Sequence, residues 1–329
     1  MEWYWIVLIA VVGAFLFFFL IPTLIMSFVL YSVLLVRNKP EKWGRVCSMP
    51  EDPECKRMFD LGLEWDAQYK DCKKEVTVTS DGFRLVGEYY DFGARSAVII
   101  ISGRTESLLY SYYFAEPFRA SGYNVLVIDN RAHGLSEGKV SSLGYKEYRD
   151  VIQWSRLLHD ELENESVILH GICIGASVAV FAAVSKECPE YIKAISVEGM
   201  YVNFYESFVN HMRHDRPDTK TFPIMQEVML HIRVFSGANV VTDGPLKRIP
   251  KLKKPILFLH SREDQYSLPD KAELLYDACT APKRIVWFDK GLHSRIRINN
   301  TEKYDKAISD YLRDLPGLIA ESEKIQQEG

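Results

Sequence analysis

Hydrophobic and polar positions divide the chain into an apolar N-terminal run, a mixed segment and a long series of alternating elements. Residues 3–36 contain no charged side chain. Because roughly 20 apolar residues suffice to cross a hydrocarbon core, this run predicts a transmembrane helix. No basic segment precedes it and it is too long for the core of a signal peptide, so we do not expect cleavage. The alternative is a hairpin of two short spans that turns at Pro22 and Thr23.

The flanks of the apolar run predict its orientation. Aromatic residues typical of a membrane interface stand at its start, namely Trp3, Tyr4 and Trp5. Basic residues follow its end, namely Arg37, Lys39, Lys42 and Arg45, whereas only Glu2 precedes it. Since basic residues favour the cytoplasmic side, we expect a single-pass membrane protein with residues 1–37 as anchor. Its partner is the lipid bilayer, through residues 3–36, and its main domain is cytoplasmic.

The pattern after the anchor predicts a sheet. Residues 38–73 read as a linker with a short helix near residues 54–69. Residues 76–79 and 84–90 flank Asp81-Gly82 and predict an antiparallel hairpin at a sheet edge. Short apolar strands are then expected at residues 97–102, 124–129, 166–170, 194–197, 256–260 and 284–288. Helices are expected between them, at residues 110–121, 145–162, 173–186, 269–279 and 301–313. Continuous apolar strands that alternate with helices predict a mostly parallel, doubly wound sheet.

A strand–turn–helix motif carries the first candidate chemistry. The apolar run at residues 166–170 is followed by Gly171-Ile172-Cys173-Ile174-Gly175 and then by a small-residue helical pattern. The two glycines allow strand and helix to approach closely, so the Cys173 side chain is expected over the strand end. The helix N-terminus favours a thiolate there. The alternative interpretation is a small cysteine buried in the core.

This pentapeptide resembles Gly-x-Ser-x-Gly, the nucleophile elbow of the α/β-hydrolases, with cysteine in place of serine as in the dienelactone-hydrolase branch. The resemblance covers residues 74–315 and implies the α/β-hydrolase fold, with the order nucleophile, acid, histidine. It maps the acid to Asp264, rather than the adjacent Glu263, and the base to His293 in Gly-Leu-His after the last strand. It also implies that the backbone N–H groups of Arg104 and Ile174 form the oxyanion hole.

Two further segments resemble the lysophospholipase and monoacylglycerol-lipase-like (serine aminopeptidase-type) branch. One is Gly-Arg-Thr-Glu-Ser at residues 103–107; the other is Asp-Asn-Arg-Ala-His-Gly-Leu-Ser at residues 129–136, a structural loop in that branch. The resemblance therefore makes His133 structural. Residues 199–254 lack a clear strand and are expected to form a short cap insertion over the site. Residues 316–329 are expected to be a C-terminal tail.

Composition narrows the function classes. A net charge of -4 gives no case for nucleic-acid binding, which needs a concentrated basic surface. The six cysteines match neither a zinc site nor a dense disulfide framework, and no metal or organic cofactor is implied. We expect a membrane-anchored hydrolase that cleaves an ester or thioester, of a small-molecule or lipid acyl substrate, through Cys173, His293, Asp264 and an acyl-enzyme. The alternatives are an acyltransferase on the same fold and a catalytically silent membrane-bound binding module.

Overall fold

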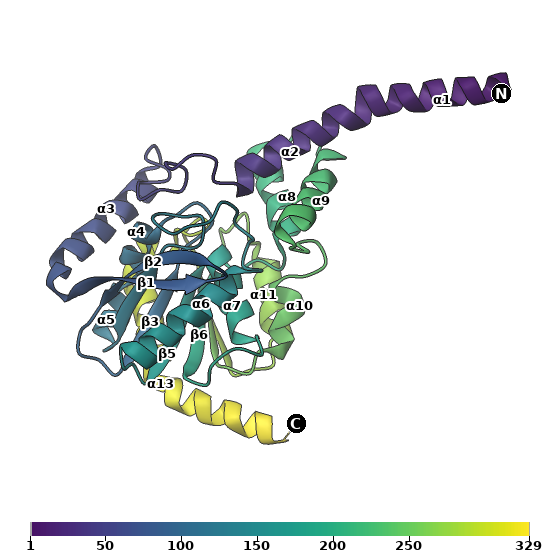
Figure 1. Ribbon diagram of the computed structural model, residues 1–329. Helices are drawn as coiled ribbons and strands as arrows, with labels where there is room; N and C mark the ends of the chain where they lie inside the picture. The colour runs from purple at the N-terminus through teal and green to yellow at the C-terminus, as the bar shows by residue number, and fades with distance from the viewer. Residues whose placement is uncertain (1, 329) are drawn as a thin grey trace.

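Eight strands form one sheet in the order β1-β2-β4-β3-β5-β6-β7-β8, in a computed structural model that describes residues 2–328 (Figure 1). Their bounds are β1 Lys73–Ser80, β2 Phe83–Tyr90, β3 Ser96–Ile101, β4 Asn124–Ile128, β5 Ser166–Ile172, β6 Ile192–Glu198, β7 Ile256–Ser261 and β8 Lys283–Phe288. Strands β3 to β8 are parallel, and β1 and β2 form the expected antiparallel edge hairpin. The predicted fold class is confirmed, and each predicted strand is present.

The strand side chains alternate between two cores. In β3, Ala97, Ile99 and Ile101 face one core, whereas Val98 and Ile100 face the other. One face is covered by α6 (Glu147–Arg156), α7 (Ile174–Ala183), α10 (Pro245–Arg248) and α11 (Pro269–Ala278). The other is covered by α3 (Pro53–Gln68), α4 (Leu108–Ser111), α5 (Glu116–Ala120), α12 (Ile296–Asn299) and α13 (Thr301–Glu328). Because apolar side chains leave both faces, the sheet needs helices on both sides.

Two predicted helix bounds are wrong. The helix expected at residues 110–121 is split into α4, a 3₁₀ turn and α5. Pro117 lies in the first turn of α5, where its missing N–H is tolerated, whereas in the middle of one long helix it would break a backbone hydrogen bond. The residues expected to be a C-terminal tail mostly continue α13, which runs to Glu328 through Pro316. Leu315 packs in the second core and Ser322 donates a hydrogen bond to the Lys253 carbonyl, so tertiary contacts hold this extension.

The segment predicted to be a linker is built into the domain. Asp52 caps α3 by accepting a hydrogen bond from the Cys55 N–H at 2.9 Å, and Cys55 and Met58 are fully buried. Arg45 forms ion pairs with Glu88 on β2 at 2.8 Å and with Asp129 after β4 at 3.0 Å. Residues 38–73 therefore form part of one layer of the fold.

The N-terminal run forms one continuous bent helix, made of α1 (Trp3–Phe15), a π-helical turn η1 (Leu16–Leu20) and α2 (Ile21–Leu35) (Figure 1). The alternative hairpin at Pro22 is wrong. Pro22 lies in the first turn of α2, directly after the π-helical turn. The π-helical turn accommodates the hydrogen bond that proline cannot donate, so the helix continues through Pro22 and the chain does not turn back. This helix is long and apolar enough to cross a membrane.

The basic residues after this helix are engaged with the protein. Lys42 Nζ donates to the Val33 and Val36 carbonyls at 2.6 and 2.5 Å, at the C-terminal end of α2. Arg37 donates to the Gly134 carbonyl at 2.9 Å. Lys42 thus complements the carbonyl-rich end of the helix and Arg37 ties the following segment to the loop after β4, structural roles that the orientation argument from sequence did not include.

Candidate active site

The nucleophile elbow has the strained backbone that its sequence predicts. Cys173 joins β5 to α7 with φ 56° and ψ −112°, and its side chain is partly exposed. A Cβ on Gly171 would lie 2.2 Å from the Gly175 carbonyl oxygen, and one on Gly175 would lie 2.0 Å from the Ile101 carbonyl oxygen. Both positions therefore require glycine. The Cys173 N–H is tied to the Glu198 carbonyl at 2.9 Å, which fixes the elbow against β6.

The structure brings Asp264, and not Glu263, to His293. His293 Nδ1 lies 2.8 Å from Asp264 Oδ2. The other oxygen of Asp264 accepts hydrogen bonds from the Tyr266 and Ser267 N–H groups at 3.0 and 2.8 Å. Glu263 instead accepts from the Gly291 N–H at 2.9 Å. The two carboxylates thus orient different parts of the loop after β8.

Electrostatics favour a charged His293. Burial opposes the imidazolium, but the Asp264 carboxylate and Cys173 hold the pKa of His293 well above its ordinary value. Burial likewise opposes ionisation of Asp264, but His293 and the Ser267 N–H hold the pKa of Asp264 below its ordinary value. Among the residues described, His293 Nε2 has no hydrogen-bond partner of standard geometry. This nitrogen is therefore available for the Cys173 proton.

The predicted oxyanion donors lie in the loop after β3 and at the start of α7. Across residues 2–328, no hydrogen-bond acceptor engages the N–H of Arg104 or of Ile174. The preceding Gly103 N–H donates to the buried Glu106 carboxylate at 3.2 Å, and the Arg104 carbonyl lies 2.6 Å from His133 Nε2. His133 thus braces the loop, as a structural histidine would.

The N-terminal segment also reaches this loop. Arg104 Nη1 donates to the Leu34 carbonyl at 3.3 Å, at the end of α2. Trp43 stacks on the His133 ring with centroids 4.7 Å apart. The loop after β3 is therefore supported by α2 and by residues just beyond it.

Three residues beside the triad were missed from the sequence. Glu198, at the end of β6, is fully buried; burial raises its pKa to about 7, and it accepts a hydrogen bond from the Tyr304 hydroxyl at 2.7 Å. Gly199 has φ 59°, and a Cβ there would lie 3.1 Å from the His293 ring. His211 stacks on Tyr266, and burial lowers its pKa to about 4. The Glu-Gly pair directly after a buried strand was the available sequence signal.

The predicted insertion forms a helical cap with α8 (Phe204–Asp215) and α9 (Ile224–Ser236). Most of its basic side chains are exposed, but the His211 ring lies near that of His293, with centroids 6.3 Å apart. The cap therefore contributes at least one polar side chain to the surroundings of the triad.

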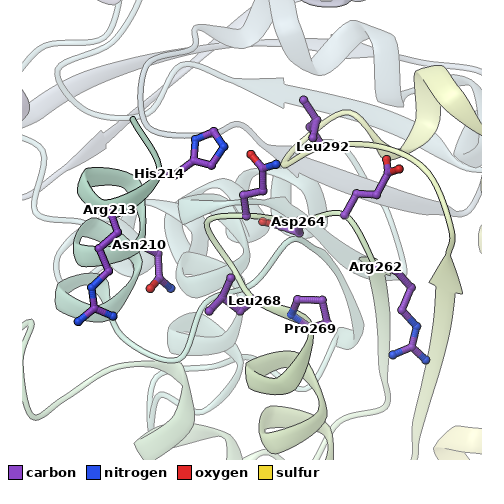
Figure 2. A pocket seen from close by; sticks show the side chains of 10 residues that line it. Asn210, Arg213, His214, Arg262, Asp264, Leu268, Pro269 and Leu292 are labelled. Carbon is purple, nitrogen blue, oxygen red and sulfur yellow. The ribbon is translucent and has the colours of Figure 1, made fainter. Parts of the chain in front are cut away.

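Two hollows lie at the edge of the cap. An open depression of about 790 Å³ separates α8 from the loop after β7, with Asp264 in its wall (Figure 2). Figure 2 shows Arg213 and Arg262 on opposite sides of it. Arg262 is already paired with Glu273 at 3.0 Å and stacked on Trp287. A narrower cavity of about 180 Å³ is bordered by Leu34, Arg104 and the inner face of α8.

Within the described residues 2–328, no cluster of three or more histidine, cysteine or acidic side chains is arranged to hold a metal ion. The six cysteines are free thiols. A thiol, an imidazole, a carboxylate and two backbone N–H groups without an acceptor meet at this site, a set of groups suited to acyl chemistry.

Comparisons with known proteins agree with this architecture. A family model described as alpha/beta hydrolase fold matches residues 96–223. The uncharacterized protein YqkD of Bacillus subtilis is 27% identical over 264 residues, which cover 79% of this chain and 86% of YqkD. Protein bem46 of Schizosaccharomyces pombe is 23% identical over 198 residues, 60% of each chain. The structure of the Pyrococcus furiosus esterase Pf2001 superposes with a TM-score of 0.62 at 21% identity, over 74% of this chain and 92% of the esterase.

Proposed function

Since the chain has the α/β-hydrolase fold, we propose that it is a membrane-anchored hydrolase that cleaves an ester or thioester through an acyl-Cys173 intermediate. The observation that carries this proposal is the 2.8 Å contact between His293 and Asp264 beside the strained elbow at Cys173. The esterase named above supports the reaction class. The two loops at residues 103–107 and 129–136 support the lysophospholipase and monoacylglycerol-lipase-like branch.

The mechanism assigns one role to each group. His293 Nε2 takes the Cys173 proton, and the sulfur attacks the substrate carbonyl carbon. The N–H groups of Arg104 and Ile174 stabilise the oxyanion, typically by about 3 kcal/mol per donor. The leaving group takes the proton from His293 as the tetrahedral intermediate collapses to an acyl-cysteine thioester. His293 then deprotonates a water molecule that attacks this thioester and releases Cys173 and the carboxylic acid.

The membrane part of the proposal rests on the N-terminal helix. Residues 3–36 would span the bilayer once, and the basic residues after them favour a cytoplasmic catalytic domain. A lipid acyl substrate suits this location. Water as acyl acceptor distinguishes the proposed hydrolase from an acyltransferase on the same fold.

The test is alkylation of the full chain in detergent by chloroacetamide over a pH series, with each cysteine read by peptide mass. We expect Cys173 to react fastest at every pH, because the neighbouring His293, whose pKa the Asp264 carboxylate holds above its ordinary value despite burial, takes up the thiol proton. Cys188 is the internal control. Burial raises the pKa of its thiol, so its labelling should be slow and should rise with pH. Equal rates at Cys173 and Cys188 would contradict the proposal.

A further inference from the structure

The second half of the anchor helix pairs with cap helix α9. Thr23 Oγ1 donates to Glu227 Oε1 at 2.8 Å, and Ser27 Oγ lies 3.0 Å from His231 Nε2. One turn further along both helices, the rings of Tyr31 and Phe235 are 5.5 Å apart. Successive contacts are four residues apart on each helix, and the residue numbers of both partners increase in the same direction. The two helices therefore run parallel along one seam, and Figure 1 shows α9 next to α2.

The faces turned away from this seam are apolar and exposed. On α2 the exposed side chains are Ile25, Met26, Val29 and Val33. On α9 and just before it they are Phe222, Leu230 and Val234. Phe28 and Phe235 contact each other across the seam and are also partly exposed at its edge. Val234 is 65% exposed and Phe222 is 75% exposed. A large exposed apolar surface of this kind marks an interaction site.

Lipid is the occupant that the surroundings favour. The exposed face of α2 continues directly from α1, whose side chains are all exposed in a helix long enough to span a bilayer, and α9 packs beside α2. The only acidic residue of α9, Glu227, is buried in the seam. The only arginine, Arg233, is exposed in the last turn, where a long cationic side chain can reach lipid phosphates.

A cavity lies between this corner and the active site. Leu34, in the last turn of α2, borders the cavity of about 180 Å³ together with Arg104 and with Phe204, Phe208 and His211 of α8; Ser207, Asp215 and Arg216 give it a polar part. The Arg104 side chain also lies near enough to Cys173 for their charges to interact. The cavity thus has the end of α2 on one side and a neighbour of Cys173 on the other.

We infer that α2 and α9 together form a surface that is seated in the bilayer, and that the substrate is an acyl ester or thioester dissolved in that bilayer, whose acyl chain enters beside Leu34. The substrate part of this inference rests on the proposed function. The seating of α9 in lipid does not, because it follows from the helix pair and its exposed faces.

Photolabelling by lipid tests the seating without any catalysis. The full chain is placed in phosphatidylcholine nanodiscs that contain a phosphatidylcholine with a diazirine in its acyl chain, irradiated, and mapped by peptide mass. We expect adducts in α1, on the exposed face of α2, and on α9 at Leu230 and Val234. Helix α11 is the internal control, because Leu274 is 45% exposed but lies away from the anchor. Adducts confined to α1 and α2, or α9 labelled no more than α11, would overturn the inference.

A matched pair of variants tests the route of the substrate. The ratio of turnover on a long-chain acyl ester in the nanodisc to turnover on a soluble butyryl thioester is measured for each. Leu230→Glu with Val234→Glu should lower this ratio at least about tenfold, because a carboxylate is poorly tolerated in the acyl region. Leu274→Glu should leave it unchanged. An unchanged ratio in both would overturn bilayer delivery, whereas absence of turnover on either substrate in the wild type would overturn the proposed function and leave the photolabelling result to decide the seating.

Discussion

The two sides of the Cys173 site are built in different ways. On the acid–base side, Asp264 and His293 come from the loops after β7 and β8 and are held by short turns and by each other. On the oxyanion side, the loop after β3 is braced by Glu106, by His133 and, through Leu34, by the anchor helix. The first side is held mainly within the loops after β7 and β8, with Arg295 also paired to Asp52 at 3.3 Å, whereas the second is braced by the end of α2.

This difference makes the two sides separable by experiment. Alkylation of Cys173 needs a thiolate but forms no tetrahedral oxyanion, so it reports the acid–base side alone. Ester turnover needs both sides. A substitution on the acid–base side should therefore lower both rates, and a substitution on the oxyanion side should lower turnover only.

His293→Ala should have the largest effect. It removes the base and the partner of the thiolate, so turnover of a soluble thioester should fall about 10⁴-fold. Alkylation of Cys173 at pH 7 should fall at least about tenfold, because the thiol loses the group that takes its proton. Both are measured on the same preparation, with Cys47 as an internal reference. Alkylation at the wild-type rate in this variant would show that His293 does not activate the thiol.

Asp264→Asn should have the next largest effect. The amide keeps the size of the side chain but removes the charge that raises the pKa of His293. We expect turnover to fall about 10³-fold and alkylation of Cys173 to slow as well, because His293 becomes a weaker base. Glu263→Gln is the matched control, because Glu263 contacts the Gly291 N–H and not His293. A greater loss in Glu263→Gln would reverse the assignment of the acid.

Glu106→Ala should separate the two sides. It removes the acceptor of the Gly103 N–H, directly before the proposed oxyanion donor Arg104. Turnover should fall about tenfold to a hundredfold through kcat, because the donor loses its fixed position. Alkylation of Cys173 should stay within about twofold of the wild type. Glu106→Gln keeps a carbonyl oxygen for Gly103 and should restore turnover; equal losses in both rates would instead indicate general disruption of the site.

The same difference explains how far the sequence could predict this site. The order of Cys173, Asp264 and His293 was predictable because each residue follows an apolar strand, and parallel strands end at one edge of the sheet. The structure brings these three together. The supports on the oxyanion side depend on contacts between segments far apart in sequence, such as Leu34 with Arg104, for which no local periodicity gives a signal.

The anchor shows the same limit. Its apolar run predicted a helix, but the two halves of this helix differ in their contacts with the rest of the protein. Thr23, Ser27 and Tyr31 recur every four residues and face α9, whereas α1 has no such polar stripe. This spacing was visible in the sequence. Its meaning required the position of α9, because helix partners are set by tertiary packing.

Glu198→Gln should have the smallest effect on turnover and a measurable effect on stability. Burial raises the pKa of Glu198 to about 7 in the folded protein. As the pH rises from about 4.5 to about 7, Glu198 therefore ionises in the unfolded chain before it does so in the folded protein, and the free energy of unfolding falls. The wild type should therefore lose up to about 3 kcal/mol over this range relative to the glutamine variant, which cannot ionise.

Thermal unfolding in detergent should show equal midpoints near pH 4.5 and a midpoint several degrees higher for Glu198→Gln at pH 8. The exposed Glu190→Gln is the control and should follow the wild type throughout. The Glu198 carbonyl holds the Cys173 N–H. A pH-dependent difference in unfolding midpoint between the two proteins would therefore show that a buried carboxyl group next to Cys173 destabilises the fold at high pH.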